Sequence, residues 1–166
     1  MTERRVRPKI SIRTQARVFR RDGWLCRWCH RPVVLGPAMR LLEELARAGD
    51  KDKPLAYYHP HWTRHSAPLL DHLGAVVDHV EAWATGGAHD EGNFATSCNK
   101  CNTRKNSKLA EAYSKLVPGK RVRGKYGEPK HWDGFSSLFL VLAGQGAKLN
   151  AGERQWLKEL RAAPNE

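Results

Sequence analysis

The sequence predicts an α+β protein in which two short antiparallel strands lead into a helix and further helices surround this unit. Three observations support the prediction. Four cysteines are arranged as two C-x-x-C pairs, a spacing typical of metal sites. Residues 76–108 contain a β-branched run, a Gly-Gly loop, a second short run and a basic tail with a helical pattern. Segments on both sides of that stretch have apolar residues with helical spacing.

Length and composition bound the class of protein. A chain of 166 residues suits one domain with appendages. Mean hydropathy is −0.65 and 28% of the residues are charged, and no apolar run reaches the ~18–20 residues needed to cross a bilayer. The N-terminus is basic but lacks the apolar segment of a secretory signal. We therefore expect a cytoplasmic protein with no membrane partner.

Positive charge is concentrated in two blocks of a chain whose net charge is +12. Residues 1–31 carry ten Lys or Arg against two Asp or Glu, and residues 100–130 carry the same numbers. Each block contains or adjoins one cysteine pair, so a metal ion held by both pairs would bring the blocks together. Clustered positive charge is typical of nucleic-acid binding. A solvated basic surface is the simpler alternative.

The elements before the first cysteine pair are a basic arm and a helix. Residues 1–11 are rich in arginine and predict an irregular arm. Residues 12–21 have apolar side chains at i, i+4 and i+7, which predicts a helix that ends at Asp22. Trp24 and Trp28 flank the cysteines, where we expect them to wall the metal site rather than to stack on bases.

Residues 32–73 are expected to form an insertion between the two halves of the metal site. Residues 37–48 predict an amphipathic helix with proline in its first turn and glycine at its end. Residues 50–68 are irregular and contain three histidines. A second metal site is one interpretation, which the lack of suitably spaced acids or cysteines disfavours; packing on the core or contact with DNA are the others. These histidines are His59, His61 and His65.

The central stretch predicts the strand pair and its helix. Residues 76–80 and 94–97 are the expected strands, and residues 99–116 the expected helix. The first strand contains the adjacent acid and imidazole Asp78-His79. The pair Asp71-His72 is an alternative, but no β-branched run precedes it, so we favour Asp78-His79 as the functional pair.

The chain after this unit divides into a basic loop and a helical extension. Residues 117–132 are rich in Gly, Pro and positive charge and lack apolar periodicity. Residues 133–166 are expected to pack on the core. Asn150 and Glu153 resemble a capping box ahead of a helix at residues 154–162. Together with the basic arm, this division leaves residues 12–116 as the main domain.

The cysteine spacing predicts a structural zinc site. Pairs of this kind in an intracellular protein favour zinc over disulfides, and 68 residues separate them. Four thiolate ligands leave no open position on zinc, so its role would be structural. Reduced free thiols and a redox pair are the alternatives. The expected ligands are Cys26, Cys29, Cys98 and Cys101.

The polar residues of the central stretch support phosphodiester chemistry. A strand pair feeding a helix would bring Asp78, His79, Asn93 and Asn102 to one end of the unit. Carboxylate and amide oxygens are ligands for Mg²⁺ or Mn²⁺, and imidazole is a suitable general base near neutral pH. His89 lies in the loop between the strands, where contact with phosphate and simple solvation are both open.

The combined pattern resembles the HNH endonucleases. Arg20–Cys29 reads RRDGWLCRWC, and the later stretch contains Asp-His, Gly-Gly, Asn and C-x-x-C-N-x-x-K. The resemblance implies a ββα-metal core of the zinc-stapled subgroup, usually bacterial or phage-encoded, that cuts DNA. It implies that His79 is the general base, that Asp78 and Asn102 hold the catalytic Mg²⁺ or Mn²⁺, and that Asn93 orients the loop bearing His79.

Two other classes compete with an endonuclease. One is a non-catalytic zinc module that binds nucleic acid through the same basic surface, and the other is a phage assembly module. The intact set of four polar residues disfavours a pure binder, which needs none of them. Target sequence, biological role and oligomeric state, a homodimer included, stay open. Expected DNA contacts are Arg20, Arg21, Lys100, Arg104, Lys105, Lys108, Lys120, Arg121, Arg123 and Lys125.

Overall fold

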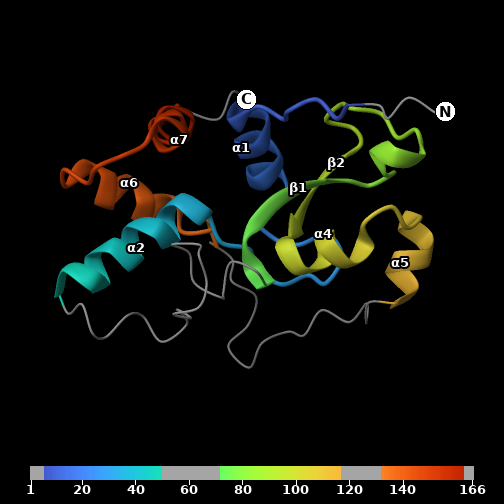
Figure 1. The fold of residues 1–166 in the computed structure, drawn as a ribbon, viewed down its shortest axis with the longest axis horizontal. Coiled ribbons are helices and arrows are strands. Elements are labelled where there is room, and N and C mark those ends of the chain that lie inside the picture. The colour runs from blue at the N-terminus through green and yellow to red at the C-terminus, as the bar shows by residue number, and fades with distance from the viewer. Residues whose placement is uncertain (1–5, 50–71, 117–131, 163–166) are drawn as a thin grey trace.

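A computed structural model describes residues 6–49, 72–116 and 132–162 of the chain. The fold is α+β, with one two-stranded sheet among helices (Figure 1). Within the described residues, no helix is long and apolar enough to span a membrane. In chain order the elements are α1 (Ile12–Arg21), α2 (Gly36–Gly49), β1 (Ala75–His79), η1 (Trp83–Thr85), β2 (Phe94–Cys98), α4 (Asn99–Lys105), α5 (Ala110–Leu116), α6 (Ser136–Gly144) and α7 (Ala151–Arg161).

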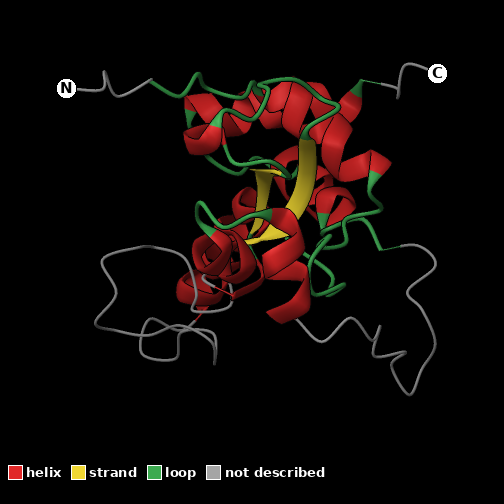
Figure 2. Ribbon diagram, turned by 90° about the vertical axis from the view of Figure 1, so that its right-hand side faces the viewer, coloured by secondary structure: helices red, strands yellow, loops and turns green. Residues whose placement is uncertain are grey.

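The predicted strand pair is confirmed, with small shifts at the strand ends. β1 and β2 are antiparallel, and their register pairs Ala75 with Cys98 and His79 with Phe94. Every residue of β2 is buried, because helices enclose the sheet (Figure 2). Cys98 ends β2 and is also the N-cap of α4, its Sγ accepting from the Cys101 N–H. The second cysteine pair therefore lies where strand becomes helix.

The helix expected at residues 99–116 is two helices, which corrects that prediction. α4 ends at Lys105, and α5 starts at Ala110. Asn106 between them has φ +48°, a conformation that asparagine adopts more readily than most residues. Its backbone N–H still bonds the Asn102 carbonyl at 3.1 Å. The break lets α5 leave the axis of α4.

The helices outside the strand–helix unit pack beside it and contribute to the same hydrophobic core. α2, α6 and α7 lie on one side of the sheet, α4 and α5 lie on the other, and α1 is between them (Figure 1). The Phe19 ring of α1 stacks on Trp156 of α7 at 6.1 Å and contacts Trp24 at 5.1 Å. A side chain at Gly134, which has φ +67°, would collide with the Trp24 ring. This dense packing fixes α1 and the cysteine knuckle that follows it.

The region predicted as an insertion begins inside the core. Val33 and Leu35 are buried, as are several residues of α2. Val34 forms a parallel bridge with Gly74, and the Leu35 N–H bonds the Gly134 carbonyl at 2.8 Å. The start of the predicted insertion therefore packs on the core, and its boundary at residue 32 stays a prediction. The three histidines of residues 50–68 lie outside the described residues.

The predicted bounds of α1 and the predicted capping box of α7 are confirmed, while α7 begins at Ala151, three residues before its predicted start. α1 has the predicted bounds, and Ser11 caps it by accepting from the Thr14 N–H. Asn150 and Glu153 form the predicted capping box, with both reciprocal hydrogen bonds present. Arg40 of α2 bonds the buried Glu153 carboxylate at 2.7 Å. The capping box thus also ties α7 to α2.

Candidate metal centres and active site

The four cysteines converge on one site. Their Sγ atoms all lie within 4.8 Å of one another, and none of the four forms a disulfide. Cys29 Sγ and Cys98 Sγ are 3.8 Å apart. A tetrahedral zinc with Zn–S bonds of about 2.3 Å places its sulfur atoms about 3.8 Å apart. This four-cysteine cluster can hold a metal ion, and its donors and spacing fit zinc.

The environment favours the thiolate at Cys26 and Cys29. Cys26, Cys98 and Cys101 are buried and Cys29 is half-buried. Hydrogen bonds from the other three thiols lower the pKa of Cys26, and one from Cys101 lowers the pKa of Cys29 to about 7. Hydrogen bonding to Cys101 and the other thiols raises the pKa of Cys98, and hydrogen bonding to Cys26 and Cys29 raises the pKa of Cys101. A thiolate is the form that binds metal. Four protein donors close the coordination sphere, so the site suits a structural ion.

A second polar site lies at the end of the strand pair. Asp78 and His79 of β1 and Asn102 of α4 line one cavity of about 470 Å³. Arg7, Trp83 and Asn106 are among the other lining residues. The structure therefore brings three of the four predicted residues of the central stretch to one cavity. Asn93 is not among the residues that line this cavity; its side chain forms hydrogen bonds within the loop between the strands.

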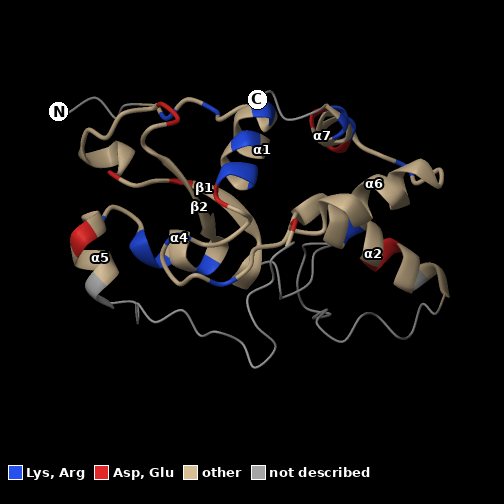
Figure 3. Ribbon diagram, turned by 180° about the vertical axis from the view of Figure 1, so that it is seen from behind, with Lys and Arg blue, Asp and Glu red and all other residues tan. Residues whose placement is uncertain are grey.

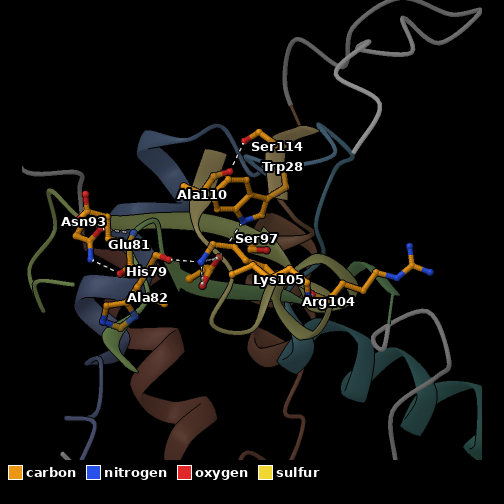
Figure 4. Close-up of polar contacts among 12 residues, drawn as sticks. Trp28, His79, Glu81, Ala82, Asn93, Ser97, Arg104, Lys105, Ala110 and Ser114 are labelled. Atoms are coloured by element: carbon orange, nitrogen blue, oxygen red, sulfur yellow. Dashed lines mark hydrogen bonds and ion pairs between the residues drawn. The ribbon is translucent and has the colours of Figure 1, made fainter. Parts of the chain in front are cut away.

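Asp78 is held by two buried donors. Its side chain is only 9% exposed. Trp28 Nε1 donates to Oδ2 at 3.0 Å, and Lys105 Nζ lies 3.2 Å from the same oxygen (Figure 4). Burial raises the pKa of Asp78, while the Lys105 ammonium and the Trp28 indole N–H act in the opposite direction. The carboxylate is therefore fixed in orientation while it faces the cavity.

His79 is buried and neutral at pH 7. Its side chain is 1% exposed, and the Phe94 ring packs edge-on against it at 5.0 Å. His79 Nε2 hydrogen-bonds His89 Nδ1 at 3.1 Å. Burial first, and then electrostatic interactions with Arg7, His89 and Lys105, lower the pKa of His79 to about 4. A neutral imidazole can accept a proton, and His89 is its direct partner rather than a solvated loop residue.

Asn93 closes the loop between the strands. Its Nδ2 donates to the carbonyls of Glu81 at 2.9 Å and Ala88 at 2.8 Å, and its Oδ1 accepts from the Glu81 N–H at 2.8 Å (Figure 4). One amide side chain therefore joins both ends of the loop that follows His79. These bonds are of the kind predicted for a residue that orients the loop.

Comparison with known proteins agrees with this geometry. Residues 68–108 match the family model described as HNH endonuclease. These residues are an HNH domain. Neither the curated proteins nor the solved structures gave a match to the chain. Within the HNH domain, His72 is exposed, whereas Asp78 and His79 line the cavity.

One predicted DNA contact of the HNH domain needs correction. Lys105 is fully buried, and its Nζ donates to the His79 carbonyl at 2.7 Å besides pairing with Asp78. It therefore presents no charge to a phosphate on the surface. Helical spacing alone grouped it with Lys100, Arg104 and Lys108, because periodicity does not report long-range ion pairs.

Two arginines of α1 also have internal partners. Arg20 donates to the Leu160 carbonyl at 2.9 Å. Arg21 bonds Asp22 and the Phe94 carbonyl. Arg104 and Lys108 are exposed and Lys100 is half-buried, so these keep charge at the surface. Figure 3 marks the Lys and Arg positions of α1 and α4 in blue. Lys120, Arg121, Arg123 and Lys125 lie outside the described residues.

Sequence reasoning missed Trp28 and Arg7 as members of the site. Trp28 was expected only to wall the cysteine cluster, yet its indole reaches Asp78. Arg7 was assigned to a peripheral arm, yet it lines the cavity. The position of Trp28 between two cysteines was the available signal, because a residue inside a metal knuckle has a fixed direction. No comparable signal marked Arg7.

Proposed function

We propose that this chain is a metal-dependent HNH endonuclease that hydrolyses DNA phosphodiester bonds. The observation that supports it most is the convergence of Asp78, His79 and Asn102 on one cavity, within the segment that matches the HNH endonuclease family. The four-cysteine cluster next to it would hold structural zinc. Asp78 and Asn102 would hold Mg²⁺ or Mn²⁺, since one carboxylate and one amide leave room for water and phosphate oxygens.

The residues divide the chemistry between them. His79 takes a proton from the attacking water as oxygen bonds to phosphorus. The bond from phosphorus to the 3′ oxygen breaks, which leaves a 5′-phosphate and a 3′-hydroxyl. A bound divalent cation supplies stabilisation of charge on the phosphate and the leaving oxygen. Asn93 holds the loop that follows His79 through three hydrogen bonds.

DNA is the substrate that the charge distribution favours. The net charge is +12. Arg7 brings a guanidinium to the cavity itself, and Arg104 of α4 and Lys108 just after it add exposed positive charge. Phosphate binding by such a surface is electrostatic and independent of sequence. It therefore supports a nucleic-acid backbone as the partner without defining a target sequence.

The test is cleavage of supercoiled plasmid by the purified chain in Mg²⁺, Mn²⁺ or EDTA. Wild type should nick or linearise the plasmid with either metal and do neither in EDTA. His79→Ala should lower turnover by about 10²–10⁴-fold and retain DNA binding. His72→Ala is the matched control, because His72 belongs to the alternative Asp-His pair and is exposed. Wild-type cutting by His79→Ala, or loss of cutting by His72→Ala, would contradict the assignment.

A further inference from the structure

The carboxylate of Asp78 has two fixed partners whose roles the proposed function does not use. Trp28 Nε1 donates to Oδ2 at 3.0 Å. Lys105 Nζ lies 3.2 Å from Oδ2 and 3.5 Å from Oδ1, and it also donates to the His79 carbonyl at 2.7 Å. The ammonium sits 5.3 Å from the centre of the Trp28 ring. Asp78, Trp28 and Lys105 therefore form one buried polar cluster.

Both partners are attached to the four-cysteine cluster. Trp28 lies between Cys26 and Cys29 within the first knuckle, and Lys105 follows Cys101 by four residues on α4. The Trp28 ring is also braced by Tyr113 of α5, which packs edge-on at 5.5 Å. An ion at the cysteines would therefore fix the donors that orient Asp78.

We propose that Trp28 is a positioning residue of the divalent-cation site that links the four-cysteine cluster to it, and that Lys105 balances the charge of Asp78 in that site. This inference rests on the proposed function, because it takes Asp78 as a ligand of the cation. Trp28 directs the carboxylate with a neutral N–H donor. Lys105 is the counter-ion that keeps the buried carboxylate paired while no divalent cation is bound.

The two residues have opposite expected effects on cation affinity. Loss of the Trp28 donor frees the carboxylate to rotate, and partners of metal ligands typically contribute about 10–100-fold in affinity. Loss of the Lys105 charge removes a cation next to the incoming one, and like charges at this range repel strongly in a buried site. The same loss leaves the buried Asp78 unpaired, which destabilises the cation-free protein.

The experiment is titration of the zinc-loaded full chain with Mn²⁺, followed by electron paramagnetic resonance, with zinc content and unfolding temperature measured in parallel. Trp28→Phe should bind Mn²⁺ about 10–100-fold more weakly than wild type and keep its zinc. Trp132→Phe is the matched control, because it also loses one indole hydrogen bond, to the Val33 carbonyl at 2.8 Å, away from the cavity. It should bind Mn²⁺ as wild type does.

Lys105→Met provides a second measurement that leaves the first knuckle intact. It should bind Mn²⁺ about tenfold or more tightly, while its unfolding temperature without Mn²⁺ should fall. Lys108→Met, at an exposed lysine of the same region, should change neither value. Weaker Mn²⁺ binding by Lys105→Met would overturn its role as counter-ion.

The remaining outcomes separate this inference from the proposed function. Asp78→Asn should abolish Mn²⁺ binding; if it binds as wild type does, the proposed cation site itself is wrong. If wild type binds Mn²⁺ through Asp78 but Trp28→Phe matches Trp132→Phe, the role of Trp28 is overturned and the site survives. Loss of zinc from Trp28→Phe would assign that residue to the zinc site alone and would likewise overturn its positioning role.

Discussion

Asn93→Ala tests whether the loop between the strands must be closed for turnover. Asn93 makes three side-chain hydrogen bonds, all to backbone groups at the two ends of the loop. Each such bond contributes about 0.5–1.5 kcal/mol. Because the groups are close to solvent, water replaces part of that contribution, and the low end of the range applies. The closed loop should therefore lose about 1.5 kcal/mol, the sum of three bonds at that low end.

This loss of free energy should affect the loop alone, and it should lower turnover because the loop directly follows His79. A change of about 1.5 kcal/mol alters the ratio of closed to open loop by about 13-fold. Turnover at saturating DNA should fall by up to that factor, because the loop positions the residues that follow His79. Hydrogen exchange of the backbone amides at residues 81–92 should accelerate, whereas the amides of α1 should exchange as in wild type.

Asn150→Ala is the matched control for this experiment. It also removes an asparagine side chain with a structural hydrogen bond, at the start of α7, where Oδ1 accepts from the Glu153 N–H at 2.9 Å. Loss of such a cap costs about 0.5–2 kcal/mol, so the protein should unfold more easily yet turn over DNA normally. Unchanged turnover by Asn93→Ala, with its loop amides exchanging faster, would refute the link between loop closure and catalysis.

Three further perturbations test the remaining parts of the proposal. Cys98→Ser should lose the one zinc per chain expected from metal analysis and should aggregate or unfold, since such sites supply folding free energy; full folding without zinc would contradict this. Because the pKa of His79 is lowered to about 4, kcat should stay within about twofold between pH 8 and pH 5.5, and a half-maximal rate near pH 6.5 would exclude so low a pKa. The same shift predicts that stability falls as pH drops from 6.5 towards 4, by at most about 1.4 kcal/mol per pH unit, as acid unfolding curves of wild type and His79→Gln can show. Neutralising the four basic residues of segment 120–125 should flatten the log–log salt slope of DNA binding by about 2–4 units without changing turnover, and normal binding with lost turnover would place that segment in the active site.

The sequence by itself determined the elements whose signals are local. The bounds of α1 follow from apolar spacing and a serine cap, and the start of α7 follows from a capping box. The two strands follow from β-branched and apolar runs beside a Gly-Gly loop. The cysteine cluster follows from spacing, since C-x-x-C pairs have few other uses in such a chain. Each of these signals lies within a short stretch of sequence and can be recognised without knowledge of the fold.

The sequence could indicate which residues belong to the candidate site, but not which other residues they contact. Asp78, His79 and Asn102 could be grouped because a strand pair and its helix meet at one end. The contact from Trp28 to Asp78 joins residues 50 positions apart, and no periodic pattern encodes it. The hydrogen bond from His89 to His79 likewise depends on how the loop folds back over the strand.

The tertiary structure alone determined whether several charged side chains meet solvent or an internal partner. Lys105 follows the same helical pattern as the exposed residues around it, yet burial and the Asp78 carboxylate turn it inward. Arg21 bonds a backbone carbonyl of β2, although its sequence neighbours suggest a phosphate contact. A charge on a helix face can meet solvent or a distant partner with the same local sequence, because long-range packing determines which of the two lies opposite it.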